Sequence, residues 1–562
     1  MAHDTDVCIV GAGPTGLAMA LQLKRYGVRS RIIDKALAPA HTSKALVVQA
    51  RTLELLEEMD LAENEIVRGV KVQNFSVFSE RKRIRSLNFA SLRNTSYPYL
   101  LFVPQYETEQ VLSERLTDLG TTVERGVELI GSTQDETGVE VVLRQANGSE
   151  ERLQVGWLIA CDGPHSTVRH HLGIPFAGRM LEEVFALADV HLDWSMPSDM
   201  AALFLHEGAL VGYFPRSGGL YRIIISYPPR TQVPKEVTLE EIQRSIDACG
   251  PDGARAHDPT WLSRFVINQR KVKHYVYGRV FLAGDAAHIH SPIGGQGMNT
   301  GIQDAFNLSW KLALVIAGRA PQRLLQSYDA EREPVGRNLL HATDLATRLA
   351  LLEHPMVVGV RDAIARLASA YPPVQKSIVR AISQLAVAYP QSPIVHECRS
   401  GSLRASLSRR VKRQTILHAG ERAPDGLVQI TQRAAPVRLF PAILRGIQHH
   451  LLVFASQHTT SDDQRQWREI FKLIADDYRD VITAYLVIPH TMIQFEEDGI
   501  TILRDHDGAL YQSYGMDEGG VVLIRPDGYI GLLCQPVDVT QVSTYLDSFF
   551  ISPVESQIQA PV

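Results

Sequence analysis

Val7-Cys8-Ile9-Val10-Gly11-Ala12-Gly13-Pro14-Thr15-Gly16, near the start of the chain, is the stretch from which its architecture follows. The four apolar residues predict a buried strand, the glycines a tight turn, and the apolar run after Gly16 a helix. Such a turn lets the backbone approach a pyrophosphate, whose charge is favoured by the N–H groups and dipole of the helix N-terminus. The stretch therefore predicts a dinucleotide site, for either NAD or FAD.

A second strand strengthens this interpretation. Arg31-Ile32-Ile33 is apolar enough to be buried and ends at Asp34 and Lys35. An acidic residue about 20 positions beyond the glycines is placed to hydrogen-bond an adenosine ribose. A glycine turn alone is often only structural, whereas the preceding strand and the following acid favour a dinucleotide.

Composition limits the class of protein. The chain has 562 residues, which predicts two to four domains, with 45% hydrophobic and 21% charged residues, as in an ordinary globular protein. The net charge of -5 gives no reason to expect nucleic acid as a partner. We see no signal peptide and no run of about 18 apolar residues, and therefore expect a cytoplasmic protein without a membrane span.

The five cysteines are scattered without CxxC spacing. Their odd number and their separation argue against a disulfide framework and against a zinc site, and they fit a reducing compartment. His288 and His290 invite a metal interpretation. They have no carboxylate or cysteine partner at ligand spacing, so we expect no metal site.

Two later segments repeat the strand–turn–helix pattern. The strand Leu153 to Ala160 ends in Cys161-Asp162-Gly163, and Arg279 to Ala283 ends in Gly284-Asp285-Ala286-Ala287-His288. Glycines between Gly294 and Gly301 then precede a helix that runs to Ala317 and expose backbone N–H groups to an anion.

Two further regions have different patterns. Short strands from Val184 to about Tyr227 predict an antiparallel sheet inserted into the dinucleotide fold, as a lid and wall for a substrate pocket. Near the C-terminus, a strand at Leu451, a helix from Gln464 and a strand from Ile482 precede a hairpin whose turn is Arg525-Pro526-Asp527-Gly528.

Three elements of the sequence resemble, in their order and spacing, the class A flavoprotein monooxygenases, the p-hydroxybenzoate hydroxylase-like aromatic hydroxylases. These elements are the glycine stretch with Asp34, then Cys161-Asp162-Gly163, then Gly284-Asp285-Ala286-Ala287-His288. The resemblance spans about Val7 to Ala317. The tail from about Leu417 resembles the thioredoxin-like domain of the phenol and polyketide hydroxylase branch, without a CxxC after Phe454.

The resemblance implies an α/β protein with a Rossmann-like FAD-binding fold, an inserted antiparallel substrate sheet and a C-terminal thioredoxin-like domain. The expected boundaries are 1–180 with 275–400 for the FAD-binding domain and its helical extension, 181–274 for the inserted sheet, and 410–562 for the thioredoxin-like domain. A homodimer is also expected from the resemblance.

The resemblance further implies which residues bind FAD. Asp34 would hold the adenosine ribose, Asp162-Gly163 would serve both FAD and NAD(P)H, and Asp285 would bond the ribityl chain. Lys44 stands where the family usually has an arginine, and a solvated lysine is its alternative role. Helix capping is the alternative for Gln105. The full expected set is Gly11, Gly13, Pro14, Thr15, Gly16, Asp34, Lys35, Lys44, Gln105, Asp162, Gly163, Asp285, Pro292, Gly297, Met298 and Asn299.

The activity implied is hydroxylation of a phenolic or polyketide-like aromatic substrate. FAD, reduced by transiently bound NADPH or NADH, reacts with O2 to give a C4a-hydroperoxide that transfers the oxygen. Among His206, Tyr213, Tyr221 and Arg222 of the inserted sheet, we expect Tyr213 to contact the substrate and Arg222 the mobile flavin. Alternation places Tyr213 and Phe214 on opposite faces, and a packing or surface role is the alternative for all four.

Three other functions are alternatives to hydroxylation. A halogenase is disfavoured because the chain has no WxWxIP stretch, and Trp194-Ser195-Met196-Pro197 does not replace one. A flavin dehydrogenase or reductase of the same fold remains an alternative. A non-catalytic flavin-binding sensor is the third.

Overall fold

The glycine stretch forms the strand, turn and helix that its sequence predicts. In a computed structural model of the chain, which describes residues 3–43, 45–227, 236–291, 294–352, 354–399, 417–430, 435–456, 458–491 and 499–551, β1 (Thr5–Val10) leads into α1 (Pro14–Arg25). β1 lies between β2 (Ser30–Asp34) and β11 (Glu150–Ala160) and pairs with both in parallel. The carboxyl ends of all three strands therefore meet at one edge, where dinucleotides bind in such sheets.

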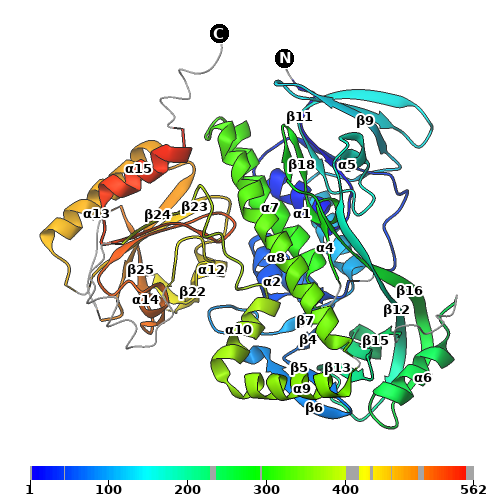
Figure 1. Cartoon of the computed structure of the whole chain (residues 1–562). Helices are drawn as coiled ribbons and strands as arrows, with labels where there is room; N and C mark the ends of the chain where they lie inside the picture. Colours follow the sequence, from blue (N-terminus) through cyan, green and yellow to red (C-terminus); the bar gives the residue numbers. More distant parts are fainter. Residues whose placement is uncertain are drawn as a thin grey trace.

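The first sheet has eight strands, of which six follow the order β17-β18-β11-β1-β2-β8. β9 and β10 form an antiparallel extension from β11. α1 and α7 (Gly297–Ile316) pack against each other beneath this sheet (Figure 1). The remaining strands are β8 (Glu124–Arg125), β9 (Glu128–Gln134), β10 (Val139–Arg144), β17 (Val276–Tyr277) and β18 (Val280–Leu282).

The second sheet contains the inserted strands, and also strands from outside the predicted insertion. Its order is β19-β16-β12-β15-β14-β13-β5-β6. β5 joins the inserted strands through parallel pairing with β13, a connection that strand-like alternation alone does not reveal. The bounds are β5 (Asn74–Ser79), β6 (Lys82–Asn88), β12 (Ala177–Asp193), β13 (Met200–His206), β14 (Ala209–Pro215), β15 (Leu220–Ser226), β16 (Arg255–Lys271) and β19 (His288–Ile289).

Helices and a small sheet connect these two layers. A three-stranded sheet has the order β3 (Val47–Val48), β7 (Leu100–Phe102) and β4 (Val70–Val72), and its strands flank β5 and β6 in the chain. α7 is buried along most of its length and runs beside α8 in Figure 1. The helices are α2 (Ala50–Glu58), α3 (Ala62–Ile66), α4 (Gln105–Asp118), α5 (Thr167–His171), α6 (Leu239–Cys249), α8 (Gln326–Ala350), α9 (Pro355–Ala370) and α10 (Pro372–Ile382), with the short helices η1 (Phe89–Ser91), η2 (Ser217–Gly219), η3 (Gly284–Ala286) and η4 (Gln322–Leu325).

The C-terminal part, coloured yellow to red in Figure 1, contains the third sheet, in the order β20-β27-β26-β23-β24-β25-β21-β22. β23, α13 and β24 form the predicted β-α-β unit, and β26 and β27 form the predicted hairpin. The bounds are β20 (His396–Arg399), β21 (Leu427–Ile430), β22 (Val437–Arg438), α12 (Leu439–Ala442), β23 (His449–Phe454), α13 (Ser461–Leu473), η5 (Ile474–Tyr478), β24 (Ile482–Ile488), β25 (Thr501–Asp505), α14 (Ala509–Tyr514), β26 (Gly520–Ile524), β27 (Ile530–Gln535) and α15 (Val539–Phe549).

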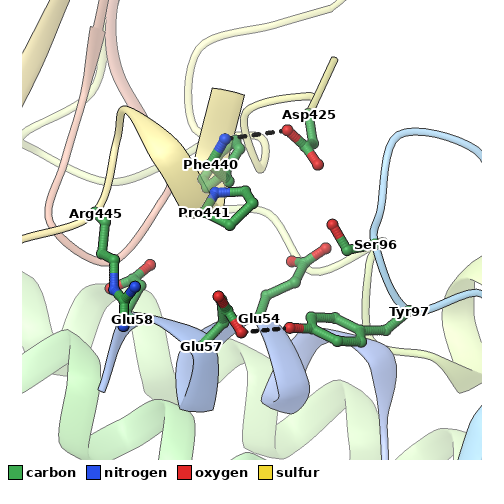
Figure 2. Close-up of a pocket in the computed structure, with 9 residues that line it drawn as sticks. All are labelled: Glu54, Glu57, Glu58, Ser96, Tyr97, Asp425, Phe440, Pro441 and Arg445. Carbon is green, nitrogen blue, oxygen red and sulfur yellow. Dashed lines mark hydrogen bonds between the residues drawn. The ribbon is translucent and has the colours of Figure 1, made fainter. Parts of the chain in front are cut away.

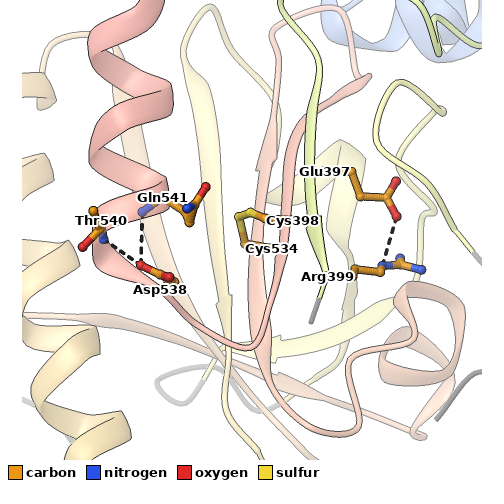
Figure 3. Close-up of a disulfide and its surroundings, with 7 residues drawn as sticks. All are labelled: Glu397, Cys398, Arg399, Cys534, Asp538, Thr540 and Gln541. Atoms are coloured by element: carbon orange, nitrogen blue, oxygen red, sulfur yellow. Dashed lines mark hydrogen bonds and ion pairs between the residues drawn. A yellow bond between two sulfur atoms is a disulfide. The ribbon is translucent and has the colours of Figure 1, made fainter. Parts of the chain in front are cut away.

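A disulfide joins Cys398 of β20 to Cys534 of β27, which are opposite each other on neighbouring parallel strands (Figure 3). Cys8, Cys161 and Cys249 are free and buried. The sequence argument against a disulfide framework did not anticipate this pair, because the two cysteines are 136 residues apart and only the sheet brings them together.

Two features of the described residues bear on membrane and metal partners. No helix there is long and apolar enough to cross a membrane. Nor do those residues contain a group of three or more histidine, cysteine or acidic side chains arranged to hold a metal ion.

Candidate cofactor and active site

The glycine turn brings the ends of β1 and β11 into direct contact. Gly11 has a φ of 101°, and a Cβ at this position would lie 2.3 Å from the carbonyl oxygen of Cys161. A Cβ at Gly16 would lie 1.9 Å from the carbonyl oxygen of Gly11. Gly13 differs, because a Cβ there would meet nothing within 4 Å. Gly11 and Gly16 are thus required by the protein's own packing, whereas Gly13 keeps an open space clear.

That open space is part of a cavity of about 220 Å³ at the carboxyl edge of the first sheet. It brings together six of the residues that the sequence analysis assigned to FAD, from three separate segments of the chain. Its lining residues are Val10, Gly11, Gly13, Asp34, Lys35, Val127, Glu128, Leu129, Cys161, Asp162, Gly163 and Thr167. Because its lining includes residues at the ends of β1, β2 and β11, the cavity can hold a ligand that spans neighbouring strand ends, as a dinucleotide does.

Asp34 is held in place by the turn it faces. Its Oδ2 accepts a hydrogen bond from the Ala12 N–H at 2.7 Å, and its Oδ1 accepts one from the Ala36 N–H at 2.8 Å. Arg125 lies 3.6 Å from the same carboxylate. The side chain remains partly exposed at the cavity, and carboxylate oxygens retain further acceptor capacity for a ribose hydroxyl.

Asp162 supplies the clearest sign of a missing polar partner. Its Oδ2 accepts from the Val168 N–H at 3.2 Å, but its buried Oδ1 has no hydrogen-bond partner. Burial raises the pKa of Asp162, while the hydrogen bond from the Val168 N–H acts in the opposite direction. Buried polar atoms are rarely left unpaired, so this oxygen indicates a ligand that donates a hydrogen bond in the cavity.

The third predicted element, η3, places Asp285 in an unusual position. Its side chain is exposed, although Gly284 and Ala286 on either side are buried. Thr15 of α1 fills the space beside Gly284, where a Cβ would lie 2.5 Å from the Thr15 hydroxyl oxygen. The predicted Thr15 thus packs against the protein, and α1 and η3 are fixed relative to each other.

A buried ionic cluster, which the sequence analysis missed, supports η3. Both oxygens of Asp304 are used: Oδ2 accepts from the Gly284 N–H at 2.9 Å and contacts His288 Nε2 at 2.9 Å, and Oδ1 accepts from Arg332 at 2.7 Å. Arg332 also donates to the Thr300 carbonyl oxygen at 3.0 Å. The helical spacing of these residues in α7 and α8 resembles ordinary core residues, so no local signal identifies them.

The glycine loop before α7 is held by the amide side chain of Asn299. Asn299 is fully buried and donates to the carbonyl oxygens of Val47 and Gly295, each at 2.8 Å. Its Oδ1 accepts from the Gln49 N–H at 2.8 Å. The amide of Asn299 thus shapes the loop, while Gly297 and the half-buried Met298 begin the helix beside it. The predicted residues Lys44 and Pro292 lie outside the described residues.

Gln105 is the first residue of α4, but its side chain does not cap the helix. Its side-chain Nε2 donates to Glu109 Oε1 at 2.8 Å, and its backbone N–H donates to the Ala45 carbonyl oxygen at 3.2 Å. Pro14 is buried at the first position of α1, where a proline is well tolerated.

On the inserted sheet, Tyr213 and Phe214 point to opposite faces, as alternation predicts, but Tyr213 is on the face covered by α6. Tyr213 is fully buried and stacks on Trp194, with ring centroids 5.0 Å apart. A Cβ at Gly250, just beyond α6, would lie 2.1 Å from its hydroxyl oxygen. Phe214 instead stacks on Phe102 of β7 at 5.9 Å. Because α6 needs an apolar surface to cover, this placement does not support a substrate contact by Tyr213 and favours Phe214.

Arg222 lies on the sheet face that meets the cofactor-side loops. It donates twice to Asp189, with both distances 2.8 Å, and its Nη1 donates to the Ser43 carbonyl oxygen at 2.7 Å. Arg216 forms an ion pair with the same carboxylate and donates to the Tyr106 hydroxyl at 3.1 Å. Two guanidinium groups therefore share one carboxylate at the junction of the sheet and α4.

The other two candidates on the inserted sheet are engaged elsewhere. His206 Nδ1 contacts Glu80 at the end of β5. Tyr221 donates to the Ser198 carbonyl oxygen at 3.4 Å and packs against Trp194, with ring centroids 5.1 Å apart. Neither contact involves the lining of the large cavity.

A second cavity, of about 20 Å³, lies between α2 and the C-terminal part (Figure 2). It is large enough for about one water molecule and is therefore no candidate for an organic substrate. On the α2 side its lining is acidic, with Glu54, Glu57 and Glu58. The other lining residues are Ser96, Tyr97, Asp425, Phe440, Pro441 and Arg445.

Comparisons with known proteins agree with this geometry. Residues 4–343 match the family model of an FAD binding domain, and residues 495–554 match that of the phenol hydroxylase C-terminal dimerisation domain. The chain is 36% identical to 6-methylpretetramide 4-monooxygenase of Streptomyces rimosus, over 99% of this chain and 95% of that protein.

Two further similarities cover nearly the whole chain. Pentachlorophenol 4-monooxygenase of Sphingobium chlorophenolicum is 32% identical over 94% of this chain and 93% of that protein. The solved structure of the anhydrotetracycline hydroxylase OxyS from Streptomyces rimosus superimposes with a TM-score of 0.73 at 29% identity, covering 97% of this chain and 99% of that one.

Proposed function

This chain belongs to the class A FAD-dependent aromatic monooxygenases, and from that membership we propose that it hydroxylates a phenolic or polyketide-like aromatic ring with NADPH or NADH as electron donor. The observation that supports a working cofactor site most directly is the large cavity. It has a glycine whose missing Cβ keeps space open, a carboxylate at the end of β2, and an unpaired buried oxygen on Asp162.

These residues fit FAD in type and in arrangement. The turn at Gly11 and Gly13, together with the N-terminus of α1, would hold the pyrophosphate, and Asp34 with Lys35 would hold the adenosine ribose. Asp162 and Asp285 would accept hydrogen bonds from hydroxyl groups further along the cofactor. The glycine loop before α7 would face the ring system.

When bound, FAD supplies the redox chemistry, accepting a hydride from the nicotinamide and activating O2 for transfer of one oxygen atom. The protein's own part is to bind, orient and exclude water. The N-terminus of α7, which begins at Gly297, favours negative charge at the loop through its dipole. Asn299 keeps this terminus in a single conformation, because its amide group is bonded to three backbone groups.

The inserted sheet would form the wall opposite the cofactor. Arg222 connects the sheet to the loop at Ser43, and Arg216 connects it to α4 through Tyr106. We propose that Arg222 and Arg216 fix the position of this wall relative to the cofactor-side loops, so that an aromatic substrate is held in one orientation. Phe214 would offer an apolar surface to an aromatic ring.

The test is substrate-stimulated oxidation of NADPH and NADH by the purified, FAD-loaded protein, with a panel of phenols and fused aromatic polyketides under 18O2. We expect at least one aromatic to accelerate oxidation and to gain one 18O atom. Product formed without 18O would contradict hydroxylation and favour the dehydrogenase alternative. Bound FAD with no response to either nicotinamide would contradict the proposed electron donor.

We also propose a homodimer, since residues 495–554 match a dimerisation domain. Light scattering during size-exclusion chromatography tests this directly. A mass equal to one chain of 62.4 kDa at micromolar concentration would contradict it.

A further inference from the structure

We infer that the hairpin turn Arg525–Gly528 of the C-terminal part is a positioning element of the cofactor site, acting within the same chain. The turn is hydrogen-bonded to α2 and α7, and the N-terminal ends of these two helices contact the glycine loop. This inference rests on the proposed function, because it takes residues 294–299 as the loop that faces FAD. It also gives the region matched to a dimerisation domain a second role, inside the protomer.

The turn is deeply buried although it carries charge. Arg525 is 1% exposed and Asp527 is 2% exposed. Arg525 donates to both oxygens of Glu331 in α8, at 2.6 and 2.9 Å, and it also pairs with Asp527. The Arg525 guanidinium lies 5.2 Å from the centre of the Trp310 ring of α7. A bidentate pair with an aromatic neighbour fixes an arginine in orientation as well as in position.

The turn and Glu331 are connected to α7 through hydrogen bonds of Asn307 and Lys311. Asn307 Nδ2 donates to Glu331 Oε2 at 2.6 Å and to Asp527 Oδ2 at 3.2 Å. Lys311 Nζ donates to Asn307 Oδ1 at 2.8 Å and to Glu331 Oε2 at 2.7 Å. α7 is therefore bonded to the C-terminal turn from a point about three helical turns after its start at Gly297.

The turn is connected to α2 through hydrogen bonds of Arg51. Its Nη2 donates to the backbone carbonyl oxygen of Asp527, and its Nη1 donates to Glu54 Oε2 at 3.0 Å. A Cβ at Gly528 would lie 3.0 Å from Arg51 Nη2. Gly528 therefore allows the turn to approach α2 as closely as it does.

Both helices begin at the glycine loop. Gln49 immediately precedes α2. Its backbone N–H donates to Asn299 Oδ1 at 2.8 Å, and its Nε2 donates to the Gly294 carbonyl oxygen at 3.0 Å. Asn299 is the third residue of α7. Arg51 is only two residues after Gln49, so a shift of the turn at Asp527 moves the group that holds the loop.

The cluster around Arg525 adds rigidity to the cofactor side of the protein. Helices transmit a displacement along their axes with little bending, and a site on rigid elements is more exact than a site on a free loop. Buried ion pairs contribute little net stability compared with well-packed apolar groups, but they have one satisfactory arrangement. In Figure 1 the C-terminal part lies beside α7 and α8, where such a cluster can set the relative position of the two helices.

The test compares Arg525→Lys with Arg319→Lys in the full-length, FAD-loaded protein. Lysine keeps the charge but loses the two-pronged bond to Glu331. Arg319 also connects these two parts of the chain, through an ion pair with Asp480 at 2.9 Å, but this pair is less buried and lies just after the C-terminal end of α7. The readouts are FAD affinity, the visible circular dichroism of bound FAD, and the fraction of NAD(P)H oxidation lost as H2O2.

We expect Arg525→Lys to weaken FAD binding about tenfold, to change the dichroism of the bound flavin and to raise the H2O2 fraction at least twofold. Arg319→Lys should lower the melting temperature without changing the flavin signals. A folded Arg525→Lys protein with wild-type FAD affinity, dichroism and H2O2 fraction would overturn the inference. If Arg525→Lys does not fold, Arg51→Lys is measured against the same expectations.

A second measurement needs no variant. Coupling between two sites is reciprocal, so if the turn positions the loop, FAD must stabilise the turn. We expect saturating FAD to slow amide hydrogen exchange in peptides covering 520–530, as well as in the cavity. Protection of the cavity alone would overturn the inference, whereas a wild-type protein that binds no FAD would refute the proposed function instead.

Discussion

Gly13→Ala separates what the glycine turn does for the protein from what it does for the cofactor. Gly13 precedes α1 with φ -76° and ψ -176°, a backbone conformation open to alanine, and an added Cβ would meet nothing within 4 Å. Alanine lowers the entropy of the unfolded chain, worth about 0.4–1 kcal/mol, and caps a helix less well than glycine by a similar amount. The two effects oppose each other, so the cofactor-free protein should melt within about 2 °C of the wild type.

The effect on FAD should be much larger. The methyl group would project into the cavity where we propose that the pyrophosphate lies, and overfilling a packed contact costs about 1–3 kcal/mol. Since 1.4 kcal/mol corresponds to a factor of ten, the Kd for FAD should rise about 5- to 150-fold. The measurement is titration of the cofactor-free protein with FAD, followed by flavin fluorescence.

Two other glycines provide the comparison. Gly11→Ala should damage both properties, because Gly11 has φ 101° and its Cβ would collide with the backbone of Cys161. Gly359→Ala, in α9 with nothing within 4 Å, should change neither property adversely. If Gly13→Ala binds FAD with wild-type affinity, the turn does not hold the pyrophosphate, and the reasoning that placed FAD there is wrong.

Three further outcomes are expected. Asp304→Asn leaves Arg332 buried without its countercharge and should lower the free energy of unfolding in urea by about 3–5 kcal/mol at pH 7. Arg332 and His288 hold the pKa of Asp304 below its usual value despite burial, so the advantage of the wild type should shrink below about pH 4. A difference that does not depend on pH would contradict this. Burial raises the pKa of Glu58, beside the small cavity, to about 8, so its ionisation destabilises the fold progressively from about pH 4.5 to about pH 8. Glu58→Gln should therefore match the wild type near pH 4.5 and exceed it at pH 9 by about 1–3 kcal/mol, and equal stabilities at pH 9 would refute the assignment. In denaturant, the protein should show three reactive thiols before reduction and five after it, and five before reduction would contradict the Cys398–Cys534 bond.

Local motifs predicted the cofactor side of the fold well. The glycine turn, the acid after β2 and the turn at Asp162 each lie within a few residues of a strand end, so their geometry depends mainly on neighbouring sequence. The parallel sheet then brings these ends together without further information. This is why six predicted residues line one cavity although they come from three segments.

The substrate side required tertiary information. Alternation shows that Tyr213 and Phe214 point in opposite directions, but only the position of α6 decides which one is covered. The parallel pairing of β13 with β5 likewise joins strands far apart in the chain. The role of Asn299 at the cofactor stays a prediction, and the sequence did not reveal that its side-chain amide binds three backbone groups of the protein. Partners such as Arg51 and Asp527, 476 residues apart, are invisible to any local pattern.

The buried turn at Asp527 also determines when the cofactor site can be completed during synthesis. Asn307 and its partner Asp527 are separated by 220 residues, which a ribosome adds in roughly 10 to 45 s at roughly 5–20 residues per second. During that interval α7 has already emerged, with Lys311 and Glu331 lacking the arginine that pairs with them. The nascent FAD-binding part therefore lacks this ionic partner until Arg525 has been made, and we expect a chain that stops before residue 525 to be cleaved by proteases faster than the full chain.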